Sequence, residues 1–281
     1  MPELPEVETV RRGLIPALEG AVFEQVIVRR PDLRRPFPEN MAERLVGKQV
    51  VRLGRRAKYL LIHMSDDLAL VIHLGMSGHM TVYETKNAPL PGKHDHVDFI
   101  TDGGHTIRFT DPRRFGSMDL AMSTTLERHP LFANLGPEPL SNAFNGPALA
   151  IALKGKKGPI KTALLDQTVV AGLGNIYVCE ALFRSGLSPQ KKAGTIKGTV
   201  ADRLAGNIVT VLKDAIASGG SSIRDHLKID GTLGYFQHSF AVYDREGQPC
   251  PGGDCDLSAC SGIKRIVQSG RSTFYCPTKQ R

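Results

Sequence analysis

The chain has 281 residues, of which 41% are hydrophobic and 23% charged, which is typical of a soluble globular protein with room for two domains. It contains no apolar run that approaches a membrane span, and its acidic, proline-containing start is unlike a signal or transit peptide, so we expect a cytoplasmic protein. The net charge is +8, and residues 136–281 carry 18 Lys and Arg against 11 Asp and Glu, whereas residues 1–135 carry 18 against 17. This imbalance favours a polyanionic partner, either nucleic acid or an anionic membrane surface, although a generically basic surface is an equal alternative.

The first predicted element is a helix over residues 4–19, where Val7, Val10, Leu14 and Leu18 recur at helical spacing. From about residue 20 to 120, short β-branched runs separated by Gly, Pro and Asp predict a sandwich or barrel of strands. These runs are "AVFEQVIVRR", "KQVVRLGRRAKYLLIHM", "LALVIHLGM" and "HVDFITDGGHTIRFT".

The Gly-, Pro- and Asn-rich stretch "NLGPEPLSNAFNGP" predicts a loop at a domain boundary. Beyond it the pattern becomes helical and rich in Ala and Leu, in "PALAIALKG", "IKTALLDQ", "NIYVCEALFRSG" and "TVADRLAGNIVTVLKDAIASG". "HSFAVYDREGQPC" then predicts a strand that leads into a turn, and a cysteine-bearing ribbon ends the chain.

Four of the five cysteines lie in the last 32 residues: Cys250, Cys255, Cys260 and Cys276. In a cytosolic chain, clustered cysteines are more often metal ligands than disulfides. Cys179 stands alone in an apolar helical stretch, which predicts a buried structural thiol.

A series of short motifs resembles, in order, those of the formamidopyrimidine-DNA glycosylase family of bacterial base-excision enzymes. The motifs are "PELPEVE", "GRRAKYLL", "HLGMSG", "KHDHVD", "TDPRRFG", "LGPEPL", "GNIYVCEALF", "GYFQHSFAVY" and "GRSTFYC", which run from residue 2 to 276. The resemblance therefore covers essentially the whole chain. It implies an α+β fold with an N-terminal catalytic β-sandwich and flanking helices (1–135), a helix–two-turn–helix DNA-binding domain (136–236) and a C-terminal zinc-finger-like β-hairpin (237–281).

The same resemblance implies an activity on double-stranded DNA. A monomeric, nucleoid-associated enzyme would flip and excise oxidised purines, then cleave the strand at the abasic site by β,δ-elimination. Removal of Met1 would make Pro2 a free secondary amine, and an α-amino group has a pKa near 8. Its attack on C1′ of the deoxyribose would form a permanently charged iminium (Schiff base) that promotes elimination.

The resemblance also implies roles for three charged residues near this nucleophile. Glu3 corresponds to the general acid/base, Glu6 to the glutamate that fixes the amino terminus, and Lys58 to the family's essential lysine, which would bind a phosphate beside the lesion. The alternative for the acidic residues is that they complement the dipole of the first helix, and we accept that alternative for Glu8.

Three residues match those with which the family fills the space left by the flipped nucleotide: Met76, Arg113 and Phe115. Phe115 would wedge between base pairs, Met76 would occupy the hole, and Arg113 would bind the orphaned cytosine. The alternative is that Met76 and Phe115 belong to the core. The loop-like sequences "GMSG" and "RRFG" favour insertion into DNA.

Two segments of the second half are expected at the DNA backbone. Gly172, Gly174 and Asn175 begin a predicted helix, where free N–H groups attract phosphate, and Lys161 lies on the preceding element. The segment from Gly219 to Phe236 resembles the loop that covers the flipped base, with a plain solvent loop as the alternative.

The H-x-H of "KHDHVD" places His94 and His96 on one face of a predicted strand. They could ligate a metal, but without a third ligand in view a hydrogen-bonded or DNA-facing role is favoured, and we assign His94 to DNA.

The cysteine tail departs from the family pattern of C-x2-C, hairpin and C-x2-C, because Gly253 and Lys279 stand at two ligand positions. Four thiols suffice for one tetrahedral Zn²⁺, and a metal-free hairpin is the alternative. The candidate ligands are Cys250, Cys255, Cys260 and Cys276. "GRSTFYC" is intact, so Arg271 is expected to reach DNA.

Two other functions remain open. An endonuclease VIII-like enzyme would excise oxidised pyrimidines, but Leu as the third residue of "PELPEVE" and the covering loop favour purines. A non-catalytic DNA-binding protein would have no use for Pro2, Glu3 and Lys58 together.

Overall fold

The computed structural model describes residues 2–221, 234–251 and 262–281. The chain divides into two compact units: unit 1 comprises Met1–Ala133 and Ser218–Gln237, and unit 2 comprises Asn134–Ala217 and His238–Arg281. Residues 218–221 and 234–236, which were expected in the helical second domain, therefore belong to unit 1.

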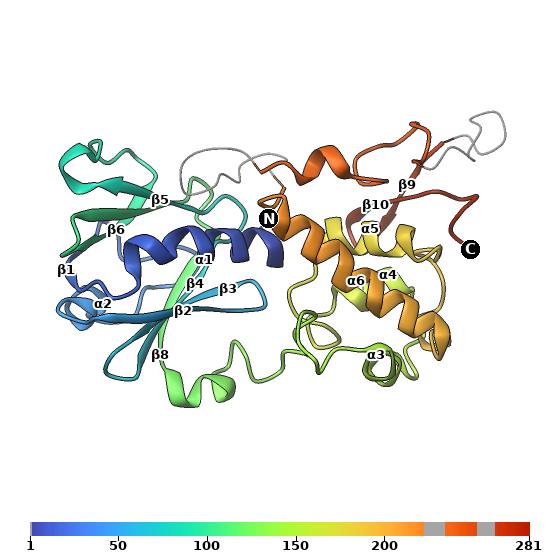
Figure 1. Ribbon diagram of the computed structural model, residues 1–281, viewed down its shortest axis with the longest axis horizontal. Coiled ribbons are helices and arrows are strands. Elements are labelled where there is room, and N and C mark those ends of the chain that lie inside the picture. The colour runs from blue at the N-terminus through green and yellow to red at the C-terminus, as the bar shows by residue number, and fades with distance from the viewer. Residues whose placement is uncertain (1, 222–233, 252–261) are drawn as a thin grey trace. The chain divides into compact units, whose positions relative to one another are not determined.

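Unit 1 is a sandwich of two four-stranded antiparallel sheets, with strand orders β1-β6-β7-β5 and β2-β3-β4-β8 (Figure 1). The strands of the first sheet are β1 (Phe23–Val28), β5 (His79–Glu84), β6 (Asp95–Thr101) and β7 (His105–Thr110). Those of the second are β2 (Val50–Arg56), β3 (Tyr59–Met64), β4 (Leu68–His73) and β8 (Ser117–Met122). Alternate residues such as Leu60, Ile62, Phe99 and Phe109 point into one shared core. The predicted β-rich first half is confirmed.

Helices cover parts of this sandwich. The predicted first helix forms as α1 (Leu4–Leu18), and its apolar stripe is fully buried against the strands. The shorter elements of the unit are α2 (Met41–Leu45) and the 3₁₀ helices η1 (Thr85–Asn87) and η2 (Ser123–Arg128). Helix α1 contacts β2 and β3, the two strands of one hairpin (Figure 1).

The run "KQVVRLGRRAKYLLIHM" folds as two strands joined by a two-residue turn. Arg56 pairs with Tyr59, and Ala57 between them has a φ of 52°. A positive φ at the first turn residue matches the right-handed twist of the flanking strands. Lys58 therefore lies at the tip of the β2–β3 hairpin.

Unit 2 combines helices with a terminal hairpin. Its α-helices are α3 (Gly146–Leu153), α4 (Ile160–Leu165), α5 (Asn175–Arg184) and α6 (Thr199–Ala217). The remaining elements are η3 (Ala193–Thr195), η4 (Phe236–Ser239), which begins at the end of unit 1, and the strands β9 (Lys264–Gln268) and β10 (Arg271–Tyr275). Helix α6 packs on α3 and α5, and α5 packs on β10. Cys179 of α5 is buried, as predicted. No helix in the described part of the chain is long and apolar enough to cross a membrane.

The strand predicted in "HSFAVYDREGQPC" is wrong, because residues 240–250 form turns. The backbone N–H groups of Ala241, Val242 and Tyr243 donate to the carboxylate of Glu180, at 2.9, 3.0 and 2.9 Å. Glu180 is fully buried in α5. A single carboxylate thus takes the hydrogen bonds that a neighbouring strand would otherwise accept.

Candidate active site

The amino-terminal residues are buried at the start of α1. Pro2 is buried, and Glu3 and Glu6 are only 3% and 2% exposed. Glu3 occupies the N-cap position, and its N–H donates to Oε2 of Glu6 at 2.8 Å. Because Glu6 binds the backbone next to Pro2, the orientation of the chain end depends on this carboxylate.

The second oxygen of Glu6 binds a distant segment of unit 1. Oε1 accepts the backbone N–H of Ser221 at 2.9 Å and its hydroxyl at 3.0 Å. Gly220, with a φ of +76°, packs directly on Glu6, since an added Cβ would lie 3.2 Å from Oε1. Glu6 is therefore a shared anchor for the amino terminus and for residues 220–221.

The expected covering loop, from Gly219 to Phe236, begins at this anchor. Residues 222–233 lie outside the described residues. The two ends of the segment meet, because Tyr235 N–H donates to the carbonyl of Ser218 at 3.2 Å. Both ends of the candidate loop thus lie together, and one of them is bonded to Glu6.

Glu8 ties the first turns of α1 to β2. It forms ion pairs with Arg11 and Arg12 at 2.8 Å each and with Arg55 at 3.4 Å. Burial acts to raise the pKa of Glu8, but the hydrogen bonds from Arg11 and Arg12 and the charge of Arg55 lower it to about 2. Glu8 therefore has a tertiary role beyond the helix dipole.

Lys58 is 8% exposed at the hairpin tip, in an environment shared with a histidine. His73 pairs across the strands with Tyr59, and their rings lie 4.9 Å apart. Burial, followed by the charges of Lys58 and Arg34, lowers the pKa of His73 to about 4. His73 is thus neutral at pH 7, and its Nδ1 accepts the N–H of Gly75 at 3.0 Å.

The candidate DNA-inserting side chains lie on the surface of unit 1. Met76 is 37% exposed and Phe115 is 42% exposed, so neither belongs to the core. The guanidinium of Arg113 lies over the Phe115 ring, 5.0 Å from its centroid. Exposed apolar tips on adjacent loops suit contact with a partner.

In unit 2, the start of α5 is joined to the terminal hairpin. Gly174 is the N-cap of α5, and Asn175 Nδ2 donates to the carbonyl of Ser272 at 2.8 Å. Arg271, directly before Ser272, is exposed. Gln167, which the sequence analysis missed, accepts the N–H of Gly172 at 2.8 Å and braces this turn. Two expected phosphate-contacting segments are therefore neighbours.

Two sequence expectations need correction. Lys161 is fully buried, so its ammonium is not placed on the surface as a phosphate contact requires. His94 and His96 do not share a strand face, because His94 precedes β6 and is exposed, whereas His96 is buried. His96 Nε2 lies 2.9 Å from the carbonyl oxygen of Asp111. Within the described ranges, no group of three or more His, Cys, Asp or Glu residues could hold a metal.

Two family models match most of the chain. Residues 1–118 match the formamidopyrimidine-DNA glycosylase N-terminal domain, and residues 135–226 match the formamidopyrimidine-DNA glycosylase H2TH domain. The chain belongs to the formamidopyrimidine-DNA glycosylase family.

Family relatives are similar over the whole length. The formamidopyrimidine-DNA glycosylases of Rhodospirillum rubrum and Ruegeria pomeroyi are 59% and 56% identical, with 100% of each chain covered. The crystal structure of MutM (Fpg) from Thermus thermophilus has a TM-score of 0.86 and 39% identity, covering 99% of this chain and 98% of that one. Wild-type Lactococcus lactis Fpg, in complex with DNA that contains N7-benzyl-Fapy-dG, has a TM-score of 0.88 and 33% identity with 100% of both chains covered.

The cysteine tail of this family member is described only in part. Cys250 and Cys276 are buried at 4% and 0% exposure in a small core cluster with Phe274. Burial, and then a hydrogen bond with Cys276, raise the pKa of the Cys250 thiol, so the two sulfurs are adjacent. Cys255 and Cys260, the other candidate ligands, lie outside the described residues.

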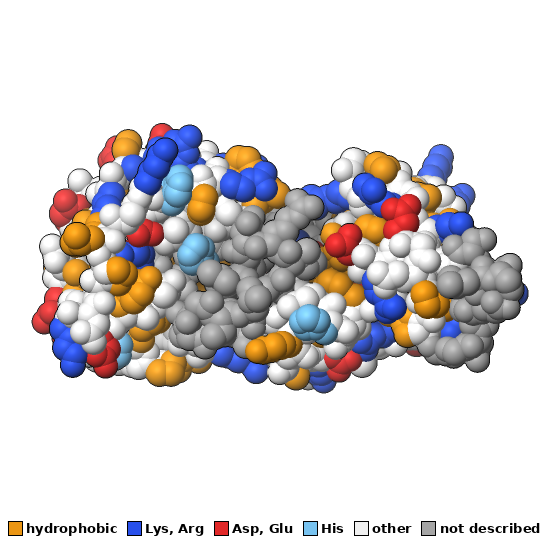
Figure 2. Space-filling model, turned by 90° about the horizontal axis from the view of Figure 1, so that it is seen from above, with side chains coloured by type: hydrophobic (Ala, Val, Ile, Leu, Met, Phe, Trp, Pro, Cys, Tyr) orange, Lys and Arg blue, Asp and Glu red, His pale blue; other side chains and the backbone are white. Residues whose placement is uncertain are grey.

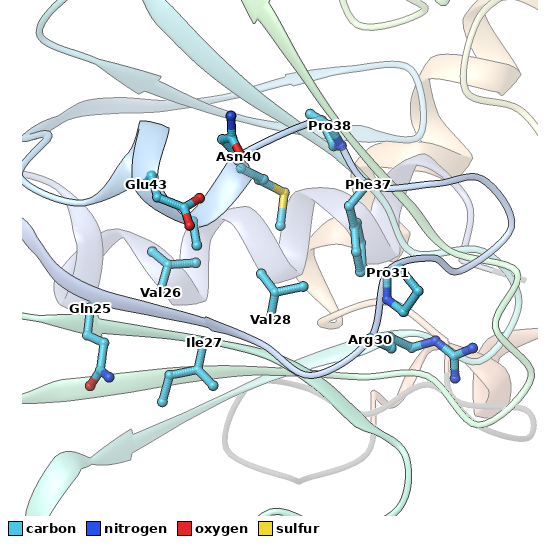
Figure 3. Close-up of a pocket in the computed structure, with 12 residues that line it drawn as sticks. Gln25, Val26, Ile27, Val28, Arg30, Pro31, Phe37, Pro38, Asn40 and Glu43 are labelled. Carbon is cyan, nitrogen blue, oxygen red and sulfur yellow. The ribbon is translucent and has the colours of Figure 1, made fainter.

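A groove of ≈ 510 Å³ in unit 1 is separate from the family's motif residues (Figure 3). It lies between β1, an edge strand, and the segment up to Glu43. Figure 3 shows Val26 and Val28 on the side of β1 that faces Phe37, with Ile27 on the other side. None of Pro2, Glu3 and Lys58 lines it.

The basic residues do not form one continuous patch on the face drawn in Figure 2. Lys and Arg side chains are interspersed there with Asp and Glu.

Proposed function

We propose that this chain excises oxidised purines, including 8-oxoguanine and formamidopyrimidines, from double-stranded DNA and cleaves the strand at the resulting abasic site. Family membership makes it a DNA glycosylase with lyase activity. The observation that carries the mechanism is the Pro2–Glu3 end, buried at the N-cap of α1 and held by Glu6. Solved Lactococcus lactis Fpg structures hold DNA with a Fapy-dG or an abasic site.

The chemistry begins once Met1 has been removed. The neutral Pro2 nitrogen attacks C1′, the bond from C1′ to the base breaks, and the base leaves with a proton. Protonation of the ring oxygen by Glu3 opens the sugar to an iminium. Loss of the C2′ proton then expels the 3′ phosphate, a second elimination expels the 5′ phosphate, and water releases the sugar fragment from Pro2.

Other residues position the DNA. Lys58, at the hairpin tip, binds the phosphate beside the lesion as a point charge. Met76, Arg113 and Phe115 fill the gap in the duplex, and their placement on exposed loops supports this role.

The duplex backbone is bound from unit 2 and from one exposed histidine. The start of α5, with Gly174 and Asn175, offers N–H groups to a phosphate, and Arg271 and His94 add positive charge or hydrogen-bond donors. The protein acts as a monomer, in the bacterial cytoplasm at the nucleoid, where its substrate is.

We also propose one structural Zn²⁺ in the tail. The buried, adjacent thiols of Cys250 and Cys276 fit two positions of an all-thiolate site, and Cys255 and Cys260 would complete it. Zinc would tie the segment before residue 251 to the β9–β10 hairpin that carries Arg271.

Borohydride trapping on an 8-oxoguanine duplex tests the main proposal. We expect a covalent adduct that maps to Pro2, and its loss when Met1 is retained, because the proline nitrogen is then an amide. A cleavage panel with 8-oxoguanine, formamidopyrimidine and thymine glycol separates the alternatives. Preference for thymine glycol would favour the endonuclease VIII-like function, and absence of any adduct would favour a non-catalytic DNA-binding protein.

A further inference from the structure

A buried carboxylate joins the two loops that carry the exposed Met76 and Phe115. Asp111 has no exposed surface, and its Oδ1 accepts the hydroxyl of Ser77 at 2.6 Å. Its Oδ2 accepts the N–H of Gly116 at 2.8 Å. Ser77 follows Met76 and Gly116 follows Phe115, so one side chain bonds directly to both loops.

Ser77 completes this connection. Its Oγ donates to Asp111 and accepts the N–H of Arg113 at 3.1 Å. Ser77 is only 3% exposed, and its hydroxyl thus connects the first loop to the backbone of the second. Buried hydrogen bonds to a carboxylate are stronger than those between neutral groups, and their loss leaves a buried acceptor unsatisfied.

The backbones of the loops are also in direct contact. Gly75 has a φ of +67°, and an added Cβ would lie 2.4 Å from both Gly116 N and Phe115 C. Arg114, between Arg113 and Phe115, has a φ of 58°, a conformation that non-glycine residues rarely adopt. Such a residue persists where surrounding interactions hold it.

Asp111 is itself attached to the sheet. Its N–H donates to the carbonyl of His94 at 2.9 Å, and its carbonyl oxygen lies 2.9 Å from His96 Nε2. His96 belongs to β6, in the core of unit 1. The connection between the loops therefore rests on a rigid strand.

We propose that Asp111 and Ser77 are positioning residues that hold the Met76 loop and the Arg113–Phe115 loop in a fixed relative position. The side chains of Met76, Arg113 and Phe115 then enter the duplex together. This inference rests on the proposed function of those side chains as gap-filling groups. It assigns a role to Asp111 of "TDPRRFG" and to Ser77 of "HLGMSG" that composition and spacing did not indicate.

Loss of this connection should therefore slow base excision from double-stranded DNA specifically. Without the Ser77 hydroxyl, Arg113 N–H loses its acceptor and Asp111 loses a donor, so the two loops can move separately. Insertion then needs an added ordering step, which lowers the rate of base excision from a duplex. Cleavage of an abasic site in single-stranded DNA needs no gap to be filled and should be spared.

Ser77→Ala and Asp111→Asn test the proposal, with Ser123→Ala as the matched control. Ser123 Oγ lies 2.8 Å from Nδ1 of buried His63 in the same unit, so its removal deletes a serine hydroxyl and its side-chain hydrogen bond away from the loops. We expect about tenfold slower single-turnover excision of 8-oxoguanine opposite cytosine by Ser77→Ala, and lyase activity on a single-stranded abasic oligonucleotide within about twofold of wild type.

A fluorescent base analogue next to the lesion reports insertion directly. Its signal should develop more slowly with Ser77→Ala and normally with Ser123→Ala. The effects of Ser77→Ala and Phe115→Ala on the rate of insertion should be non-additive in the double variant. Once the Phe115 ring is absent, fixing the position of its loop no longer speeds insertion. If Asp111→Asn does not fold, Ser77→Ala alone decides the outcome.

Two results would overturn the inference while leaving the proposed function intact. One is equal slowing of the duplex and single-stranded reactions, which indicates general destabilisation. The other is wild-type excision by Ser77→Ala. Failure of the wild-type chain to cleave either DNA would instead contradict the proposed function.

Discussion

Glu6 and Ser221 are separated by 215 positions in the chain, yet two hydrogen bonds of 2.9 and 3.0 Å join them. The other oxygen of Glu6 accepts the N–H of Glu3. The amino terminus and the base of the segment that precedes residues 222–233 therefore share one buried anchor. Substitution of Glu6 should therefore affect both the amino terminus and residues 220–221.

We expect Glu6→Gln to lower stability by about 1–3 kcal/mol, because an amide has one acceptor oxygen where the carboxylate uses two. Borohydride trapping should fall by more than DNA affinity, since the orientation of Pro2 is lost. Thermal melting, trapping and binding titration measure these effects. Glu19→Gln is the control: its Oε1 accepts the Leu53 N–H at 2.7 Å, and glutamine can keep that bond. Equal effects of the two variants would contradict the anchor.

Glu3→Gln should separate chemistry from binding. The side chain is buried and isosteric with glutamine, so DNA affinity should stay within about twofold while base excision falls by at least about a hundredfold. Arg271 is exposed, and Arg271→Ala should instead weaken binding to every duplex. The slope of log affinity against log salt concentration should become shallower by about one, as expected for the loss of one phosphate contact. Filter binding across a salt series and single-turnover excision measure both. Loss of affinity by Glu3→Gln as large as that of Arg271→Ala would refute this division.

Glu8 should make unfolding sensitive to acid. Its pKa in the folded protein is about 2, below the ordinary 4.5, so its ion pairs stabilise the fold fully above pH 4.5. That contribution, about 2–3 kcal/mol, is lost as the pH falls from 4.5 towards 2. Glu8→Gln should be less stable at pH 7 and lose less stability across this range, as chemical unfolding would show. Glu24→Gln, on the exposed side of β1, should match wild type; a wild-type pH profile for Glu8→Gln would contradict the prediction.

The zinc content of the purified protein tests the proposed metal site in the cysteine tail. Protein purified without added metal should contain about one zinc per chain, and Cys250→Ala and Cys276→Ala should lose it. Cys179→Ala is the matched control, because this buried thiol lies in the same cluster without being a proposed ligand. Chelation should weaken DNA binding before unit 1 unfolds. Zinc-free protein with reactive tail thiols and normal cleavage would establish a metal-free hairpin.

The sequence by itself determined the local elements and the chemistry-bearing residues. Helix α1 follows from the spacing of Val7, Val10, Leu14 and Leu18, and the strands of unit 1 follow from β-branched runs, since periodicity reports which face is buried. The motif order was enough to indicate the family. Both kinds of signal are carried by residues that are close together in the chain.

Only the tertiary structure decided which polar groups meet. Glu180 takes the N–H groups of residues 241–243 in place of a strand, Asp111 joins two loops, and Lys161 is buried although its sequence context suggested a phosphate contact. A buried carboxylate or backbone N–H must find a partner, but that partner can lie anywhere in the chain, and local spacing does not encode it. The exposure of Met76 and Phe115 was decided in the same way, because an apolar residue in a loop is buried or exposed according to what packs against it.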